Sequence, residues 1–386
     1  MAEQASKYLA KKRESAEGNN VERWQTLEEL YAKMLWHPLT VRLKEFMDIP
    51  EFVEKENLTE LYEKFIHEFE HRVNPLLLVE ICLPIAQSMK DPQETCQFLE
   101  KIKKTVQKDK EAVILCLTGM AGVKLESKDA RGRCLDIAGV RSILEEAESI
   151  LDSLVGVTSV HGAFHRVNSV YYKEIADYGR YYKEALRYLG CADLSKMDEK
   201  EKGTQAFCLA LAALLGKDVY NFGELLAHPI LESLSGVKEA WIVTLLRAFN
   251  SGDLAKFEEM KPVWSACEDL RAQTAFLQQK IRLLCLMEMS FARSSARRQI
   301  PLAEIAEVAR VEAKAVEPLV MRALSLGLVQ GSIDQVRQLV TITWVQPRVL
   351  DRAQVMAMAA RVQEWRHDVM SMGNLLDNEA KEILTQ

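Results

Sequence analysis

The sequence is poor in the two residues that most often interrupt helices. Glycine accounts for 17 of its 386 residues and proline for 10, shares below the averages of about 7% and about 5% in proteins. Hydrophobic residues make up 48% of the chain, enough to bury a large core. A chain of this length exceeds what one compact helical domain usually encloses. We therefore expect a mainly α-helical protein, built as two or more units or as an extended helical array.

Neither sign of charge dominates the chain. Its 50 basic and 56 acidic residues are mixed along the sequence, for a formal net charge of −6. Such a chain has no net field that would attract nucleic acid or an anionic membrane, so neither is an expected partner. No apolar run approaches the roughly 18 to 20 residues needed to span a bilayer, and the first residues lack the apolar core of a signal peptide. We expect a soluble intracellular protein.

Close cysteine pairs are missing as well. The eight cysteines form no C-x-x-C pair, whereas metal clusters need close ligand pairs, and most of them stand in apolar helical stretches. We expect them to be reduced and buried. A glycine-rich phosphate loop, a G-x-S-x-G turn and a Walker motif are also absent from the sequence. The sequence therefore predicts a protein that is not an enzyme, with no catalytic residue, no cofactor and no metal site.

Two histidine pairs must be weighed against that prediction. His67 to His71 reads H-E-F-E-H, a pattern that in zinc proteases supplies two ligands and a glutamate base. At about 100° per residue, both histidines fall roughly 140° to 180° from the apolar face of their helix, and no third ligand follows at the expected spacing. His161 and His165 have the same spacing, with no carboxylate or cysteine accompanying them. We interpret all four as ordinary helix residues, with the first pair facing solvent.

From Val21 onward the chain is a series of amphipathic segments of helical length, each closed by a proline, a glycine or a polar cluster. Aromatic and small residues alternate around residues 171–190 as in tetratricopeptide-type hairpins, although the full repeat signature is absent. We predict a solenoid-like helical-hairpin array over residues 21–268, preceded by an unpatterned mobile arm over residues 1–20. The expected helices cover about residues 24–34, 58–73, 76–89, 92–107, 110–126, 133–154, 158–177, 179–190, 200–215, 222–234, 237–250 and 254–266.

The pattern changes after a long apolar helix at about residues 269–292. A short strand at 298–300, a helix from Pro301, a turn at Arg310-Val311 and a second helix at about 312–326 follow in that order. A two-stranded hairpin at 328–346 comes next and contains LVTITWVQ, the most β-branched run of the chain. This order is that of a winged helix. The expected fold is therefore all-α, with a small α+β winged-helix module within residues 269–347.

A winged helix is often a DNA reader, so this alternative needs its own test. The second helix presents two acids and two bases outward, and the acids would repel phosphate: Glu312, Lys314, Glu317 and Arg322. One basic cluster precedes the first strand, at Arg293, Arg297 and Arg298. We favour a module that offers a sheet edge or a wing to a neighbouring protein.

The chain closes with a helix of about 35 residues, within residues 348–386. Its apolar residues recur at alternating steps of three and four, the 3.5-residue period of a supercoiled seam: Val355, Met358, Val362, Trp365, Val369, Met372 and Leu376. We call these seven residues the seam. Such a narrow stripe favours a helical partner. The alternative is a helix folded back on its own domain.

A helical-hairpin array that runs into a winged helix resembles the plan of PCI-domain subunits, found in the proteasome lid, the signalosome and a translation initiation factor. Several stretches resemble the proteasome-lid members more closely and include loop and cap residues that helical patterning would not dictate. They are LYEKFIHEFEHRVNPL (61–76), YYKEALRYLGC (181–191), NFGELLAHPILESL (221–234), KIRLLCLMEM (280–289) and GLVQGSIDQV (327–336).

The resemblance implies a structural, non-catalytic subunit of the proteasome regulatory lid, supporting ubiquitin-dependent degradation in cytoplasm and nucleus. In this family the winged helices of several subunits pack side by side, and the C-terminal helices gather in a bundle. Its partners would be other lid PCI subunits. A PCI subunit of the signalosome or of the initiation factor is the alternative. The bundle contact would fall on the seam, and the winged-helix contact on Leu339, Val340, Ile342 and Trp344.

Overall fold

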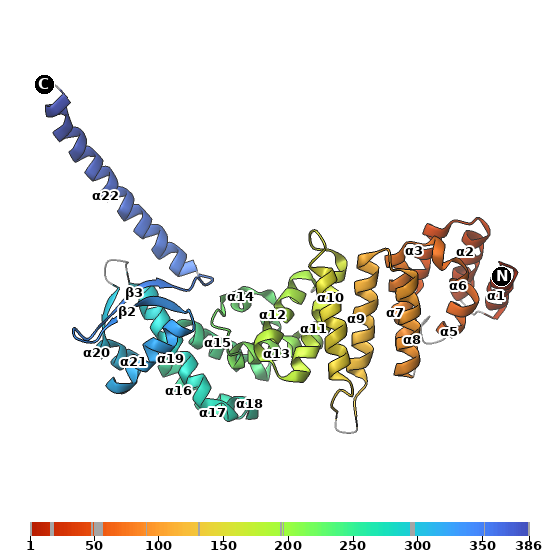
Figure 1. The fold of residues 1–386 in the computed structure, drawn as a ribbon, viewed down its shortest axis with the longest axis horizontal. Coiled ribbons are helices and arrows are strands. Elements are labelled where there is room, and N and C mark those ends of the chain that lie inside the picture. The colour runs from red at the N-terminus through yellow and green to blue at the C-terminus, as the bar shows by residue number, and fades with distance from the viewer. Residues whose placement is uncertain are drawn as a thin grey trace. The chain divides into compact units, whose positions relative to one another are not determined.

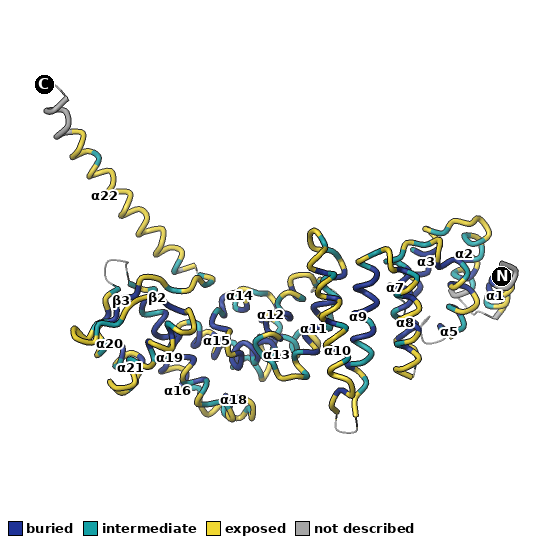
Figure 2. The backbone as a smooth tube through the Cα atoms, viewed as in Figure 1, coloured by how far each residue is buried: buried dark blue, intermediate teal, exposed yellow. Residues whose placement is uncertain are grey.

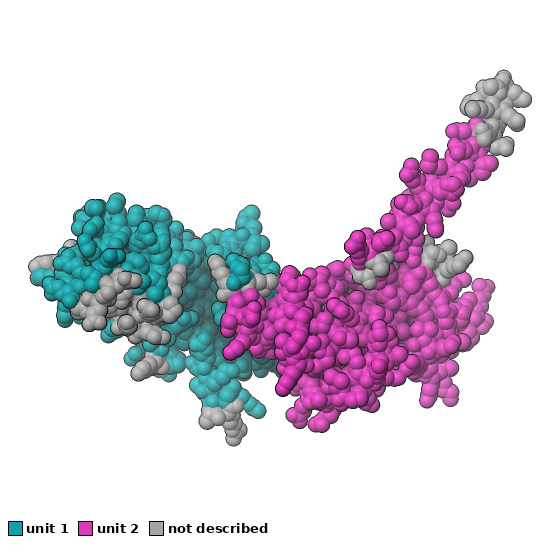
Figure 3. Space-filling view, turned by 180° about the vertical axis from the view of Figure 1, so that it is seen from behind, with its two compact units in different colours: residues 1–196 teal, residues 197–386 magenta. Residues whose placement is uncertain are grey.

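The computed structural model divides the chain into two compact units, residues 1–196 and 197–386 (Figure 3). It describes residues 2–15, 19–47, 49, 57–89, 91–129, 132–193, 195, 197–293, 298–350 and 352–384. The division falls within the predicted helical array and not at the change of pattern near residue 268. Both units are mainly helical, and a three-stranded sheet lies in the second (Figure 1). The predicted fold class is confirmed.

The helices of the first unit begin where the sequence supplies side-chain caps. Asn74, Asp91, Asp109, Asp136 and Asp177 each accept a hydrogen bond from a backbone N–H of the first turn, which satisfies a donor that the helix leaves free. The elements are α1 (Ala2–Ser15), α2 (Asn19–Ala32), α3 (Trp36–Met47), α5 (Leu58–Leu61), η1 (Tyr62–Ile66), α6 (His67–Phe69), η2 (Glu70–Arg72), α7 (Pro75–Ser88), α8 (Pro92–Thr105), α9 (Lys110–Glu126), α10 (Ile137–Leu151), α11 (Ser159–Ile175) and α12 (Tyr178–Cys191).

α1 replaces the predicted unpatterned arm. Ala5, Tyr8 and Leu9 are buried, and they stand at the i, i+3, i+4 spacing of one helix face. The ring of Tyr8 meets that of Trp24 on α2 edge-on, with 6.3 Å between the centroids. The expectation of an unpatterned arm is therefore wrong over Ala2–Ser15. Three buried apolar side chains are enough to pack this otherwise charged helix against α2. Residues 16–18 lie outside the described residues.

α9 is the central helix of the first unit. It packs against α7, α8, α10 and α11, and all residues from Ala112 to Thr118 are buried (Figure 2). A helix covered on several sides needs apolar residues all round, which is why this segment lacks a clean amphipathic stripe. α11 and α12 form a further packed pair. Within this unit, the prediction of helices packed as consecutive pairs is confirmed.

Prolines divide the second unit into shorter helices than the sequence predicted. The expected helix at 222–234 is two elements because Pro229 begins a new one, and the expected helix at 254–266 is divided in the same way near Pro262. The elements are α13 (Glu199–Leu215), α14 (Gly223–Ala227), η4 (Pro229–Leu234), η5 (Lys238–Ala240), α15 (Trp241–Ser251), α16 (Leu254–Glu259), α17 (Lys261–Trp264), α18 (Glu268–Ala272) and α19 (Thr274–Ala292).

A buried lysine joins α19 to the end of α13. The side chain of Lys280 donates hydrogen bonds to the carbonyl oxygens of Ala213, Leu214 and Gly216, over 2.7, 3.0 and 2.6 Å. These carbonyls belong to the last turn of α13 and to its C-cap residue, Gly216, where helix carbonyls lack helical partners and the helix dipole is negative. Burial lowers the pKa of Lys280 well below its ordinary value, and the charge of Asp218 opposes that shift.

The winged helix follows α19 with the predicted order of elements. They are β1 (Gln299–Pro301), α20 (Leu302–Val308), α21 (Ala313–Ser325), β2 (Val329–Asp334) and β3 (Leu339–Val345), and α22 (Arg352–Leu384) closes the chain. The antiparallel sheet has the order β1-β3-β2. Its register shifts at Gly331, where a Cβ would lie 2.1 Å from the carbonyl oxygen of Thr341. Only glycine fits that close approach.

Candidate interaction surfaces

The seam of α22 is exposed to solvent. Its seven side chains are between 44% and 68% exposed, and no residue of α22 whose burial is described is buried (Figure 2). The helix forms readily because alanine, methionine, arginine, glutamine and glutamate, all strong helix formers, fill most of its first half. The described part of the chain does not fold back over the seam. Large exposed apolar patches of this kind mark binding surfaces.

Other apolar side chains on α22 lie outside the seam and were not singled out from the sequence. Met356, Met370 and Leu375 are also exposed. At about 100° per residue, they lie about 110° to 150° from the centre of the seam. They therefore lie off the seam on the same helix, and Met356 and Met370 provide internal controls.

The sheet contributes less surface than predicted. Val340 and Ile342 are buried in the core of the winged helix, because alternate side chains of β3 face inward. The prediction that these two residues form a contact surface is wrong, since both stand on the inward face of the strand. Leu339 is half-buried and Trp344 is 37% exposed. The surface that is left consists of Trp344 and the outer edge of β2.

The two histidines of the H-E-x-x-H stretch face solvent, as predicted. His67 and His71 are both exposed. Their segment is less regular than expected, since the π-helical turn η1 and the 3-10 turn η2 flank the single α-helical turn α6. Glu70 points inward and accepts a hydrogen bond of 2.8 Å from the hydroxyl of Tyr62. Within the described ranges, no group of three or more His, Cys, Asp and Glu side chains is placed to hold a metal ion.

His165 does have a carboxylate partner, contrary to the sequence-based interpretation. Its Nδ1 lies 2.7 Å from Oε2 of Glu184 on α12, and both side chains are buried. Burial alone would raise the pKa of Glu184, but the hydrogen bond and charge of His165, with Arg187 and Asn168, hold that pKa below its usual value. The two residues stand 19 positions apart, so helix spacing could not bring them together. The pair joins α11 to α12.

This pair predicts a pH-dependent part of the first unit's stability. Because the pKa of Glu184 is lower in the folded chain than its ordinary 4.5, the unfolded chain takes up the proton first as pH falls. The stabilisation is complete above about pH 4.5 and is lost as pH falls through the folded-state pKa. We expect Glu184→Gln to lower the urea midpoint at pH 7, and the difference from wild type to shrink below pH 4.5. A difference that stays constant down to pH 3.5 would contradict this role.

Three arginines near the winged helix have side-chain partners in the same unit. Arg293 forms an ion pair with Glu304, and Arg310 one with Glu258 over 2.5 Å. On α21, Arg322 donates to the side-chain oxygen of Gln279 over 2.9 Å. Arg297, part of the predicted basic cluster, lies outside the described residues. Paired arginines of this kind offer little to a phosphate backbone.

Helix pairs, a winged helix and a long C-terminal helix together define a protein of the PCI class. Comparison with known families agrees, since the PCI domain matches residues 254–344. The family described as PSD13 N-terminal repeats matches residues 23–246. The chain belongs to the family of 26S proteasome non-ATPase regulatory subunit 13.

Individual relatives support the same assignment over most of the chain. The 26S proteasome non-ATPase regulatory subunit 13 of Dictyostelium discoideum is 34% identical over 363 residues, 93% of each chain. The probable 26S proteasome regulatory subunit rpn9 of Schizosaccharomyces pombe is 37% identical over 360 residues, 92% of each chain. The eukaryotic translation initiation factor 3 subunit M of Aspergillus terreus is 28% identical over 207 residues, 53% of this chain and 44% of that one. The likeness to the initiation factor is thus partial.

In the ranges that the structure describes, no helix combines the length and the apolar character needed to cross a membrane.

Proposed function

We propose that the chain is a structural, non-catalytic subunit of the proteasome regulatory lid, where it supports assembly and thereby ubiquitin-dependent protein degradation. Membership of the subunit 13 family supports the assignment to the proteasome. The exposed seam on α22 is the main evidence that the chain acts by binding other subunits. It is a stripe of seven apolar side chains with heptad spacing. Burying such a stripe against another helix removes apolar surface from water, which drives association.

The proposed partners are other PCI subunits of the lid. The seam would pack against their helices, and the winged helix would contribute through Trp344 and the outer edge of β2, where backbone groups are available for strand addition. Leu339 would lie at the margin of that contact. We propose action in the cytoplasm and nucleus, without a nucleic-acid or membrane partner, cofactor or metal.

Native mass spectrometry of affinity-purified particles tests this function. With an affinity tag on this chain, we expect one copy of it per lid in an intact regulatory particle. Recovery of the chain in the signalosome or in initiation factor 3, with none in the lid, would overturn the proposal and favour another PCI complex. Recovery as a free monomer alone would overturn the scaffold role altogether.

A further inference from the structure

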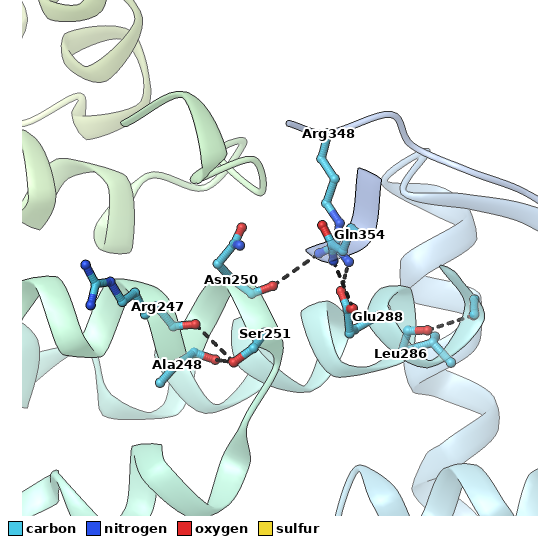
Figure 4. Close-up of polar contacts among 9 residues, drawn as sticks. Arg247, Ala248, Asn250, Ser251, Leu286, Glu288, Arg348 and Gln354 are labelled. Carbon is cyan, nitrogen blue, oxygen red and sulfur yellow. Dashed lines mark hydrogen bonds and ion pairs between the residues drawn. The ribbon is translucent and has the colours of Figure 1, made fainter. Parts of the chain in front are cut away.

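The segment that joins the winged helix to α22 is held more tightly than a linker needs to be. We call residues 346–350, between β3 and α22, the strap. Within it the side chain of Arg348 is only 3% exposed. Its guanidinium donates a hydrogen bond of 3.2 Å to the carbonyl oxygen of Asn250, at the end of α15, and forms an ion pair with Glu288 on α19 (Figure 4). An arginine is rarely buried without such partners.

The strap also presses on a third helix. A Cβ at Gly223, the first residue of α14, would lie 2.6 Å from the Cβ of Val349 and 2.9 Å from its carbonyl oxygen. Only glycine allows the strap backbone to come this close. The backbone N–H of Gln346 donates a hydrogen bond of 2.8 Å to the carbonyl oxygen of Leu328. The strap is therefore held by α14, α15, α19 and the residue that precedes β2.

Glu288 extends this hold to the base of α22. Its Oε1 accepts a hydrogen bond of 3.3 Å from Gln354 (Figure 4), while its other oxygen faces Arg348. Two turns further along α22, Arg361 donates a hydrogen bond of 3.0 Å to the carbonyl oxygen of Ala292, the last residue of α19. Gln354 and Arg361 are seven positions apart and so lie on one helix face. One carboxylate thus joins the strap, α19 and the start of α22.

A fixed base matters because α22 is a long lever. Its 33 residues span about 50 Å at about 1.5 Å per residue. A rotation of about 10° at the base moves the far end by about 9 Å, more than one helical turn of about 5.4 Å. A displacement of that size would take seam residues out of register with a partner helix.

We propose that the Arg348–Glu288 pair locks the strap and thereby presets the direction in which α22 leaves the winged helix. The pair is a positioning element for the seam, and this role rests on the proposed function. Without the lock, the helix forms but samples many directions. Each partner must then select the competent one, which lowers apparent affinity.

The test uses the full chain with Arg348→Met and Glu288→Gln combined, so that neither charge is left buried alone. Spin labels on unnatural amino acids at Ala275 of α19 and Asn374 of α22 report the distance between the helices without using the native cysteines. We expect one narrow distance distribution for wild type and a broad one for the double variant. The matched control, Arg352→Met with Glu364→Gln, changes the same residue types on exposed positions of α22 and should stay narrow.

Competition with wild-type chain during particle assembly gives the functional readout. We expect the double variant to be incorporated several-fold less than wild type, and the control equally. A narrow distribution for the double variant would overturn the lock. A broad distribution with normal incorporation would overturn its positioning role. The distances are measured on the isolated chain, so they test the lock even if the wild-type chain proves absent from the lid.

A second variant covers the case in which the double variant does not fold. Arg348→Lys with Glu288→Asp keeps both charges but shortens both side chains, so that the pair no longer spans the gap between the strap and α19. It is expected to broaden the same distance distribution. If this variant folds and the distribution stays narrow, the pair does not set the direction of α22 and the proposal fails.

Discussion

Replacing Trp365 and Val369 together by aspartate is expected to abolish incorporation of the chain into the lid while the isolated chain keeps its fold. Both side chains are more than half exposed, and exposed substitutions of this kind change stability little. In a helix–helix interface the two carboxylates would be buried without partners, at a cost of several kcal/mol. A loss of about 3 kcal/mol already weakens binding more than roughly a hundredfold. Quantitative mass spectrometry of purified particles measures the effect.

Met356 and Met370 supply the matched control for this experiment. Changing both to aspartate places the same charge on the same helix, on the side away from the seam. We expect that variant to be incorporated like wild type, with an unchanged circular dichroism spectrum. Equal loss in both variants would mean that added charge, and not the seam, decides assembly. Normal incorporation of the Trp365 and Val369 variant would show that the seam is not a lid contact.

Lys280→Met is expected to destabilise the second unit by about 3 to 5 kcal/mol. The substitution removes the donor of three hydrogen bonds and leaves three buried carbonyl oxygens at the end of α13 without it. Each buried polar group left unsatisfied costs about 1 to 3 kcal/mol. The aromatic rings of Tyr220 and Phe222, whose centroids lie 5.5 and 5.3 Å from Nζ of Lys280, would lose that contact as well. Urea unfolding followed by tryptophan fluorescence measures the loss.

Lys217→Met is the control for that measurement. Lys217 is exposed and lies close to the same turn, so the same substitution there should change stability by less than about 0.5 kcal/mol. An equal effect at both positions would mean that the buried hydrogen bonds contribute nothing particular. A Lys280→Met chain as stable as wild type would show that water or the relaxed helix end satisfies those carbonyls.

The sequence predicted features that depend on neighbouring residues. The winged helix was readable because its turns, its Gly327 and its β-branched strand are local signals. The seam was readable because the heptad period is a property of one helix. The helix starts followed from aspartate and asparagine caps.

The features that were missed depend on contacts between distant segments. His165 meets Glu184 and Lys280 meets Ala213 only after the helices pack. The central place of β3 likewise follows from its pairing with β1, about 40 residues earlier in the chain. The strap has no periodicity at all, so nothing in the sequence around Arg348 indicated that its side chain would be buried.

The central claim is that another polypeptide covers the seam, and oxidation of methionine tests it most directly. Met358 and Met372 lie in the seam, whereas Met356 and Met370 lie outside it, and all four are exposed in the isolated chain. Sulfoxide formation requires access to the thioether. In assembled particles we predict that Met358 and Met372 become protected, with clearly less protection at Met356 and Met370. Seam methionines that oxidise as fast in the particle as in the free chain would contradict the account.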